Sequence, residues 1–270
     1  MHDPQVDQNG YDQLRSWLSQ RCGITYPDHK KELLRQRLMR VVRSFDCGDL
    51  NRLAVDVIRS ERHEVQLAVM HAASTNHTFF FREREVLDNF TNMILPDLQH
   101  REEIRIWSAA ASTGDEAYTI GILIAETLGQ GALAKTRILG TDISAPVVDR
   151  AEMGVYAKRQ FDQTPPDILA RYFTPMGIEQ FQVKPEIRAT CTFRRMNLKA
   201  TPYPFKNPFQ VVFCRNILYY FDRADQVATL NAVYEVTEPG GWLVTSVTEP
   251  IRDLGSKWKQ VEPGIYRREG

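Results

Sequence analysis

The chain has 270 residues, a length that suits one or two domains and excludes a single small module. Hydrophobic residues make up 43% and charged residues 25%, which excludes a mainly disordered, collagen-like or coiled-coil protein. The 34 basic residues balance 34 acidic ones, so no global positive field is available to attract nucleic acid.

The sequence indicates a cellular compartment and argues against a metal site. The four cysteines lie far apart without Cys-x-x-Cys spacing, which argues against a zinc site or a disulfide framework and favours a reducing cytoplasm. No apolar run reaches the roughly 18 residues of a membrane helix, and residues 1–10 are too polar for a signal peptide. The six histidines lack metal-ligand spacing. We therefore expect a cytoplasmic protein with no metal and no membrane insertion.

Residues 1–75 are predicted to form a small helical domain. The first helix ends near Gly23 and carries four apolar residues on one face: Tyr11, Leu14, Trp17 and Leu18. The second covers residues 28–42 and is amphipathic, with three arginines on its polar side: Arg37, Arg40 and Arg43. Residues 50–58 and 65–73 add further helical patterns.

Strands alternate with helices in the rest of the chain, which predicts a parallel, doubly wound sheet. The expected strands are residues 104–107, 137–140, 210–214 and 242–245, and the expected helices are 115–128, 144–153 and 224–236. The run 210–214 is continuously apolar, as expected of a strand buried on both faces. Residues 173–193 fit the alternation poorly and are interpreted as a small inserted subdomain.

Polar residues follow three of these strands, where doubly wound sheets bind their ligands. Residues 111–116 contain one glycine and end in two acids, which disfavours a pyrophosphate and suits an ammonium group. Asp142 is placed to accept hydrogen bonds from ribose hydroxyls, and residues 214–221 bring polar and then aromatic groups. Together they indicate S-adenosylmethionine. Taken alone, Asp142 could equally cap a helix, and Tyr219 or Tyr220 could be ordinary core residues.

Three segments resemble the signatures of CheR-type chemotaxis receptor methyltransferases in sequence, order and spacing. They are residues 74–83 (STNHTFFFRE), 106–118 (IWSAAASTGDEAY) and 213–222 (FCRNILYYFD). The resemblance runs from about Tyr11 to Tyr266. It implies methyl transfer from S-adenosylmethionine to glutamate side chains on the cytoplasmic helices of chemoreceptors.

The resemblance also implies a fold, a domain division and a set of site residues. The expected units are a helical domain (1–75), a linker with a cofactor loop (76–89), and a Rossmann-like methyltransferase domain (90–270) with an antiparallel β-subdomain at about 173–193. Matching the motifs residue by residue implies these cofactor contacts: Asn76, Thr78, Arg82, Glu116, Asp142, Asn197, Leu198, Arg215 and Asn216. Arg82 and Tyr220 match the positions that the family is thought to use in catalysis.

The chain departs from the family pattern at two of its motifs. Residues 115–118 read DEAY in place of EEPY, which keeps the acid. Residues 246–249 read SVTE in place of GHSE, so this chain lacks the histidine of the family motif. His77 replaces a residue that varies in the family and is interpreted as structural.

The resemblance extends to partners, with two alternatives left open. The basic helix with Arg37, Arg40 and Arg43 is expected to dock acidic receptor helices. Residues 174–183 contain one glycine where tethered family members have several, so we expect no receptor C-terminal pentapeptide tether. The protein is expected to be a monomer that binds no nucleic acid. The alternatives are a non-catalytic, cofactor-binding regulatory module and a methyltransferase acting on RNA or a small molecule.

Overall fold

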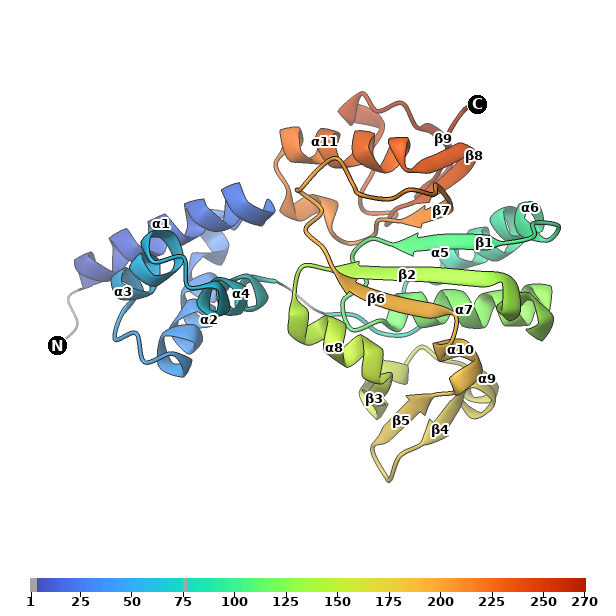
Figure 1. Cartoon of the computed structure of the whole chain (residues 1–270), viewed down its shortest axis with the longest axis horizontal. Helices are drawn as coiled ribbons and strands as arrows, with labels where there is room; N and C mark the ends of the chain where they lie inside the picture. The colour runs from blue at the N-terminus through green and yellow to red at the C-terminus, as the bar shows by residue number, and fades with distance from the viewer. Residues whose placement is uncertain (1–3, 75–76) are drawn as a thin grey trace.

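The protein consists of a helical domain followed by a larger α/β domain (Figure 1). The computed structural model describes residues 4–74 and 77–270. The helical domain is built from α1 (Pro4–Cys22), α2 (Lys31–Ser44), α3 (Leu50–Ala54) and α4 (His63–Ala73). The apolar face predicted for the first helix is buried, because Tyr11, Leu14 and Leu18 are fully enclosed and Trp17 packs against the same core.

The α/β domain is organised around a seven-stranded sheet in the order β6-β2-β1-β7-β8-β10-β9. Its strands are β1 (Ile104–Ser108), β2 (Thr136–Asp142), β6 (Cys191–Arg195), β7 (Phe209–Phe213), β8 (Thr237–Val244), β9 (Lys259–Glu262) and β10 (Ile265–Arg267). The strands from β6 to β8 in this order are parallel, and β10 and β9 form an antiparallel edge. The predicted doubly wound sheet is confirmed.

Alternate residues of the central strands enter two separate hydrophobic cores, as the period of two in a strand requires. On β1, Ile106 belongs to one core and Trp107 to the other, and on β7 the same holds for Phe213 and Val212. Both faces of the sheet are therefore buried. This explains why residues 210–214 read as an uninterrupted apolar run.

Helices cover both faces of the sheet (Figure 1). The helices of the α/β domain are α5 (Arg84–Asn89), α6 (Leu95–Leu98), α7 (Asp115–Leu128), α8 (Ala145–Met153), α9 (Pro166–Tyr172), α10 (Pro185–Arg188) and α11 (Arg223–Glu235). Of these, α9 lies beside the small inserted sheet and α10 packs on α7. The first core includes the buried side of α7, with Ile120 and Ile124, and the second includes Leu230 and Val233 of α11. No helix in residues 4–74 or 77–270 is both long and apolar enough to cross a membrane.

A small antiparallel sheet is inserted between β2 and β6, as predicted. Its strands are β3 (Val155–Ala157), β4 (Phe173–Pro175) and β5 (Gln180–Val183), in the order β3-β5-β4. The insert therefore begins upstream of residue 173. Cys191 and Phe193, which the sequence analysis included in the insert, lie on β6, where they pair with β2 at an edge of the large sheet.

A buried carboxyl group joins the start of α7 to the inserted subdomain. Asp115 has no exposed surface and accepts hydrogen bonds from the hydroxyl of Thr113 (2.6 Å) and from Nε2 of Gln160 (2.9 Å). Burial raises the pKa of Asp115 from 3.8 to about 6, because the two hydrogen bonds compensate only in part for lost hydration. Ionisation of Asp115 at neutral pH therefore destabilises the folded state.

We expect the variant Asp115→Asn to change how stability depends on pH. A raised pKa in the folded state means that the wild-type protein loses stability as pH rises from 3.8 to about 6, and asparagine cannot titrate. At 1.36 kcal/mol per pKa unit, the unfolding free energy of the variant relative to wild type should rise by up to about 3 kcal/mol across this window.

Urea unfolding at pH 4, 5, 6 and 7 measures this difference, and Asp149→Asn, an exposed carboxylate on α8, is the control. A difference between Asp115→Asn and wild type that does not vary with pH would contradict the raised pKa.

Candidate functional site

A cavity of about 1170 Å³, counted with its open mouth, lies at the carboxyl ends of the parallel strands. Its walls come from the loops after β1, β2, β6 and β7, represented by Ala110, Ile143, Met196 and Ile217. From β1 the chain proceeds to β2 on one side and later returns to β7 on the other, so the cavity lies at the topological switch point of the sheet.

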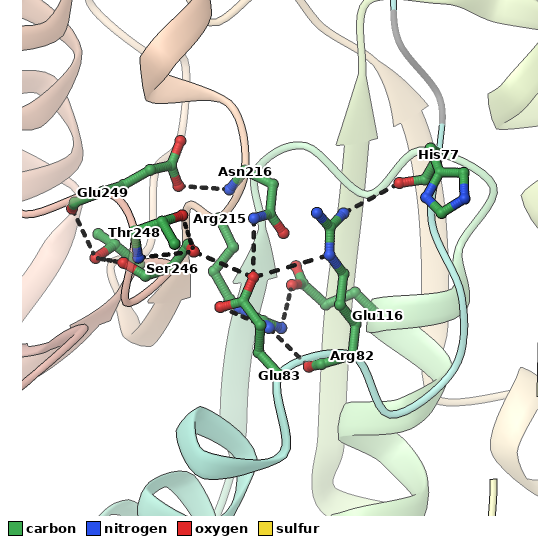
Figure 2. A network of polar contacts seen from close by, with 10 residues as sticks. His77, Arg82, Glu83, Glu116, Arg215, Asn216, Ser246, Thr248 and Glu249 are labelled. Carbon is green, nitrogen blue, oxygen red and sulfur yellow. Dashed lines mark hydrogen bonds and ion pairs between the residues drawn. The ribbon is translucent and has the colours of Figure 1, made fainter. Parts of the chain in front are cut away.

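A buried guanidinium lies at the centre of the polar network beside this cavity (Figure 2). Arg215 is 5% exposed, and its Nη1 lies 2.9 Å from Oε2 of Glu116. Its Nη2 donates to the carbonyl of Arg82 (2.7 Å) and lies 3.4 Å from Oε2 of Glu83. The hydroxyl of Ser108 donates to the other oxygen of Glu116 (2.7 Å). Arg215 thus joins β7, α7 and the loop before α5.

Glu83 receives most of its bonds from residues after β7 and β8. Asn216 Nδ2 (2.9 Å) and the hydroxyl of Ser246 (3.1 Å) donate to its Oε1. Burial alone raises the pKa of Glu83, but Arg215, Asn216 and Ser246 outweigh burial and hold the pKa below its ordinary value. Glu83 is therefore a stable carboxylate at neutral pH.

A second buried carboxyl group supports the turn after β7. Glu249 is 5% exposed and accepts the backbone N–H groups of Asn216 (2.5 Å) and Tyr219 (3.3 Å). Burial raises its pKa above the ordinary value, although backbone N–H groups lower it in part. Glu249 thereby connects the loop after β8 to the single helical turn Leu218–Tyr220.

Left-handed backbone conformations are concentrated around the cavity. Six residues other than glycine have positive φ in the parts of the chain that the structure describes: Asp46, Glu61, Phe81, Glu83, Ser112 and Asn216. The last four flank Arg82 or belong to the cavity wall. Such conformations cost about 1–3 kcal/mol each and persist where surrounding bonds fix them, as the partners of Glu83 and Asn216 do.

Asp142 ends β2, lines the cavity and bonds to the turn after β1. Its Oδ2 accepts the N–H of Ser112 and its Oδ1 accepts the N–H of Ser144, both at 3.0 Å. Burial raises the pKa of Asp142 although these N–H groups lower it in part. A carboxylate has about four acceptor positions, so it retains positions for a further donor.

Arg82 and Tyr220 both line the cavity. Arg82 Nη1 donates to the carbonyl of His77 (3.0 Å), and its Nε lies 3.8 Å from Oε1 of Glu83. Tyr220 lies beside the half-exposed Tyr219, with ring centroids 4.4 Å apart. The cavity therefore has a guanidinium and a pair of phenols near one another in its wall.

The structure brings most of the predicted site residues together. The lining of the cavity includes Thr78, Arg82, Glu116, Asp142, Asn197, Leu198, Arg215, Asn216 and Tyr220. Asn76 lies outside the described residues. The side chain of Asn197 is bonded to the helical domain, because its Nδ2 donates to the carbonyl of Arg21 (2.8 Å). His77, interpreted as structural, also lines the cavity.

Sequence reasoning missed several contributors. Cys22 and Ile24 of the helical domain line the cavity, and so does Ser112. Glu83 and Glu249 anchor the loops without having been predicted to do so. Their only sequence signals were weak: Glu83 follows Arg82 directly, and Glu249 is the acid kept in residues 246–249.

No group of three His, Cys, Asp or Glu residues close enough to hold a metal ion occurs in residues 4–74 and 77–270. The four cysteines are free thiols, and burial raises the pKa of Cys214, beside the cavity, far above its ordinary value. The polar side chains of the cavity lining are carboxylates, guanidiniums, hydroxyls and amides, together with the imidazole of His77 and the thiol of Cys22.

Comparison with known proteins identifies matches over nearly the whole chain. Family models described as the SAM binding domain and the all-alpha domain of CheR methyltransferase match residues 76–266 and 9–69. The chemotaxis protein methyltransferase of Vibrio parahaemolyticus is 31% identical over 266 residues, which are 96% of each chain. That of Escherichia coli is 32% identical over 253 residues, covering 92% of this chain and 86% of the relative.

Proposed function

This chain belongs to the CheR methyltransferase family, and we propose that it methylates glutamate side chains of chemoreceptor cytoplasmic domains. The products would be glutamyl methyl esters, formed in the cytoplasm during chemosensory adaptation. The observation that carries the proposal is one cavity that combines Glu116 and Asp142 with Arg82 and Tyr220. The first pair suits an adenosyl cofactor with an ammonium group, and the second suits a carboxylate acceptor.

S-adenosylmethionine is the cofactor of this family domain, and the chemistry of the cavity fits it. The buried hydroxyl of Ser112 has no hydrogen-bond partner among the described residues, although it lies in the cavity wall. In the cavity lining, Glu116 and Asp142 balance Arg82 and Arg215, and Glu83 pairs with both arginines from outside the lining. The cavity therefore has partners for the two positive groups and for the carboxylate of this cofactor. We propose that Glu116 holds the methionyl ammonium and that Asp142 accepts the ribose hydroxyls.

The proposed reaction needs positioning more than proton transfer. When bound, S-adenosylmethionine supplies an electrophilic methyl group on a sulfonium. A glutamate side chain has an unperturbed pKa near 4.3, so at neutral pH it is already a nucleophile and no general base is required. Arg82 and Tyr220 can orient that carboxylate in a space from which water is displaced.

The test uses purified receptor cytoplasmic domain and cofactor labelled in its methyl group. We expect labelled receptor from which base releases methanol, as glutamyl methyl esters require, and a 10- to 100-fold loss of turnover in Arg82→Ala and Tyr220→Phe. Both variants are assayed at saturating cofactor.

Substitution of the receptor glutamates by glutamine is the control and should abolish labelling. If cofactor binds but no receptor domain is labelled, the non-catalytic alternative replaces the proposal. If Arg82→Ala and Tyr220→Phe turn over like wild type, the roles of these two residues are wrong.

We expect Asp142→Asn to bind S-adenosylhomocysteine at least 10-fold more weakly than wild type. The carboxylate of Asp142 accepts hydrogen bonds from Ser112, from Ser144 and, as proposed, from the ribose. Asparagine replaces one acceptor oxygen by an NH₂ group, which cannot accept any of these bonds. Calorimetric titration measures the affinity, and Asp149→Asn on the exposed side of α8 is the matched control. Wild-type affinity with a lowered melting temperature would leave Asp142 only the helix-capping role.

We also propose that α2 docks acidic receptor helices. The side chains of Arg40 and Arg43 are exposed. Arg37 is half-buried, and its Nη1 donates to the hydroxyl of Tyr26 (2.8 Å) and to the carbonyl of Ser74 (3.2 Å). Arg37 therefore stabilises its own domain, and the docking proposal depends on Arg40 and Arg43.

Reversing both exposed charges, in Arg40→Glu/Arg43→Glu, should lower kcat/KM for receptor at least fivefold without changing cofactor affinity. The loss should shrink with added salt, because exposed charges are screened. Arg59→Glu, an exposed arginine of the same domain, is the control. Equal methylation by the double variant and wild type at low salt would show that the exposed side of α2 contacts solvent and does not bind the receptor.

The absence of a receptor tether remains a prediction. Gly177, with φ of +82°, is the single glycine in residues 174–183, in the turn between β4 and β5. The flanking residues carry side chains, which limits close pairing with a peptide backbone. We propose that this chain, acting as a monomer, finds its receptor through the helical domain and the cavity.

A further inference from the structure

Residues 19–25 of the helical domain run against the turn after β7. Cys22 and Ile24 in this segment line the cavity. The proposed chemistry assigns no task to the segment. Its contacts nevertheless cross the domain boundary at several points and reach the backbone of Tyr220.

The end of α1 is fixed by side chains of the α/β domain. Asn197 Nδ2 donates to the carbonyl of Arg21 (2.8 Å), and Lys199 Nζ donates to the carbonyl of Ser19 (3.1 Å). Lys199 also pairs with Asp225 of α11, with Nζ to Oδ2 at 2.5 Å. The carboxyl end of a helix favours a nearby cation, and the carbonyl of Arg21 receives a donor from the other domain. The end of α1 is therefore held across the domain boundary.

Gly23 allows the chain to pass directly against the turn. Its φ is +74°, and a Cβ atom there would lie 2.6 Å from Cδ1 of Phe221, a distance that side chains do not tolerate. The N–H of Gly23 still bonds to the carbonyl of Ser19 (3.0 Å), so the helix ends in an ordered turn. The next residues therefore approach Tyr220 from a fixed direction.

Thr25 holds the carbonyl of Tyr220 with two donors. Its backbone N–H lies 2.9 Å and its hydroxyl 2.7 Å from this oxygen. A carbonyl oxygen has two lone pairs, so both are used. On the other side of the same turn, Glu249 accepts the N–H of Tyr219 (3.3 Å). The backbone that carries the Tyr220 ring is thus fixed from both domains.

We propose that Thr25 is a positioning residue for Tyr220, through which the helical domain sets the geometry of the active site. The proposal rests on the proposed function, in which Tyr220 orients the acceptor. Thr25 is not one of the described residues that line the cavity, so it acts only through the turn. Misplacement of a reacting group by about 1 Å can lower a rate 100-fold, so a weaker hold on Tyr220 should lower kcat.

The first test compares Thr25→Val, which keeps the shape and the N–H but loses the hydroxyl, with Thr25→Ser, which keeps the hydroxyl. We expect Thr25→Val to lower kcat three- to tenfold with the dissociation constant of S-adenosylhomocysteine within twofold of wild type. For Thr25→Ser, both kcat and this dissociation constant should stay within twofold of wild type. If Thr25→Val melts far below wild type, Thr25→Ala replaces it with the same expectation.

Thr91→Val is the matched control, because it removes a similar bond from a hydroxyl to a carbonyl, that of Asp88 (2.9 Å), outside the cavity. It should leave kcat unchanged. Wild-type kcat in Thr25→Val, or an equal loss in Thr25→Ser and Thr25→Val, would overturn the proposal.

A double-mutant cycle tests whether Thr25 acts through Tyr220. Residues that act as a unit show non-additive effects. In the background of Tyr220→Phe, we expect Thr25→Val to change kcat less than twofold. A further loss as large as that in the wild-type background would mean that Thr25 acts elsewhere.

Hydrogen exchange separates failure of this proposal from failure of the proposed function. We expect Thr25→Val to speed amide exchange in residues 217–222 while leaving β1 unchanged, and this measurement needs no substrate. If wild type labels no receptor, the proposed function fails and the exchange result still decides whether Thr25 holds the turn. Wild-type exchange in residues 217–222 of the variant would overturn the positioning role.

Discussion

The geometry of the cavity depends on the pairing of one buried guanidinium. Arg215 bonds Glu116, which lies 99 residues away in the chain, and the carbonyl of Arg82, which lies 133 residues away. A buried charge without partners is strongly destabilising. The end of β7, the start of α7 and the loop before α5 therefore cannot separate without leaving Arg215 unpaired. This constraint explains how Glu83 and Asn216 are kept in left-handed conformations, since each bonds to the network.

The sheet was predictable because burial on both faces leaves a plain signal, the apolar run 210–214, and because Asp142 and Glu116 follow strand ends. Edge strands leave a weaker signal. Phe193 is the one buried residue of β6, and this edge strand pairs with β2. Residues 191–193 were therefore assigned to the insert in place of the large sheet. The supporting roles of Glu83 and Glu249 depend on contacts 133 and 33 residues away, which spacing along the chain does not indicate.

The helical domain also shows that sequence patterns predict helices better than contacts between distant residues. Its periodicity predicted α1 and α2 well, because amphipathic helices in a small domain bury one face. Periodicity says nothing about which exposed end of a helix meets another domain. The end of α1 bonds Asn197 and Lys199, so a unit that reads as separate in sequence supplies Cys22 and Ile24 to the cavity wall. Both domains are therefore needed to complete the site.

The net charge inside the cavity depends on whether the cofactor is bound. Glu116 and Asp142 balance Arg82 and Arg215 in the cavity lining when all four are ionised, and Glu83 pairs with both arginines from outside the lining. The sulfonium and ammonium of S-adenosylmethionine outweigh its carboxylate by one positive charge. Beside the bound cofactor, the proposed glutamate acceptor therefore meets one net positive charge, and Arg82 is the less enclosed of the two guanidiniums. The demethylated cofactor has no sulfonium, so this positive charge is lost once the methyl group is transferred, and the attraction for a carboxylate falls with it.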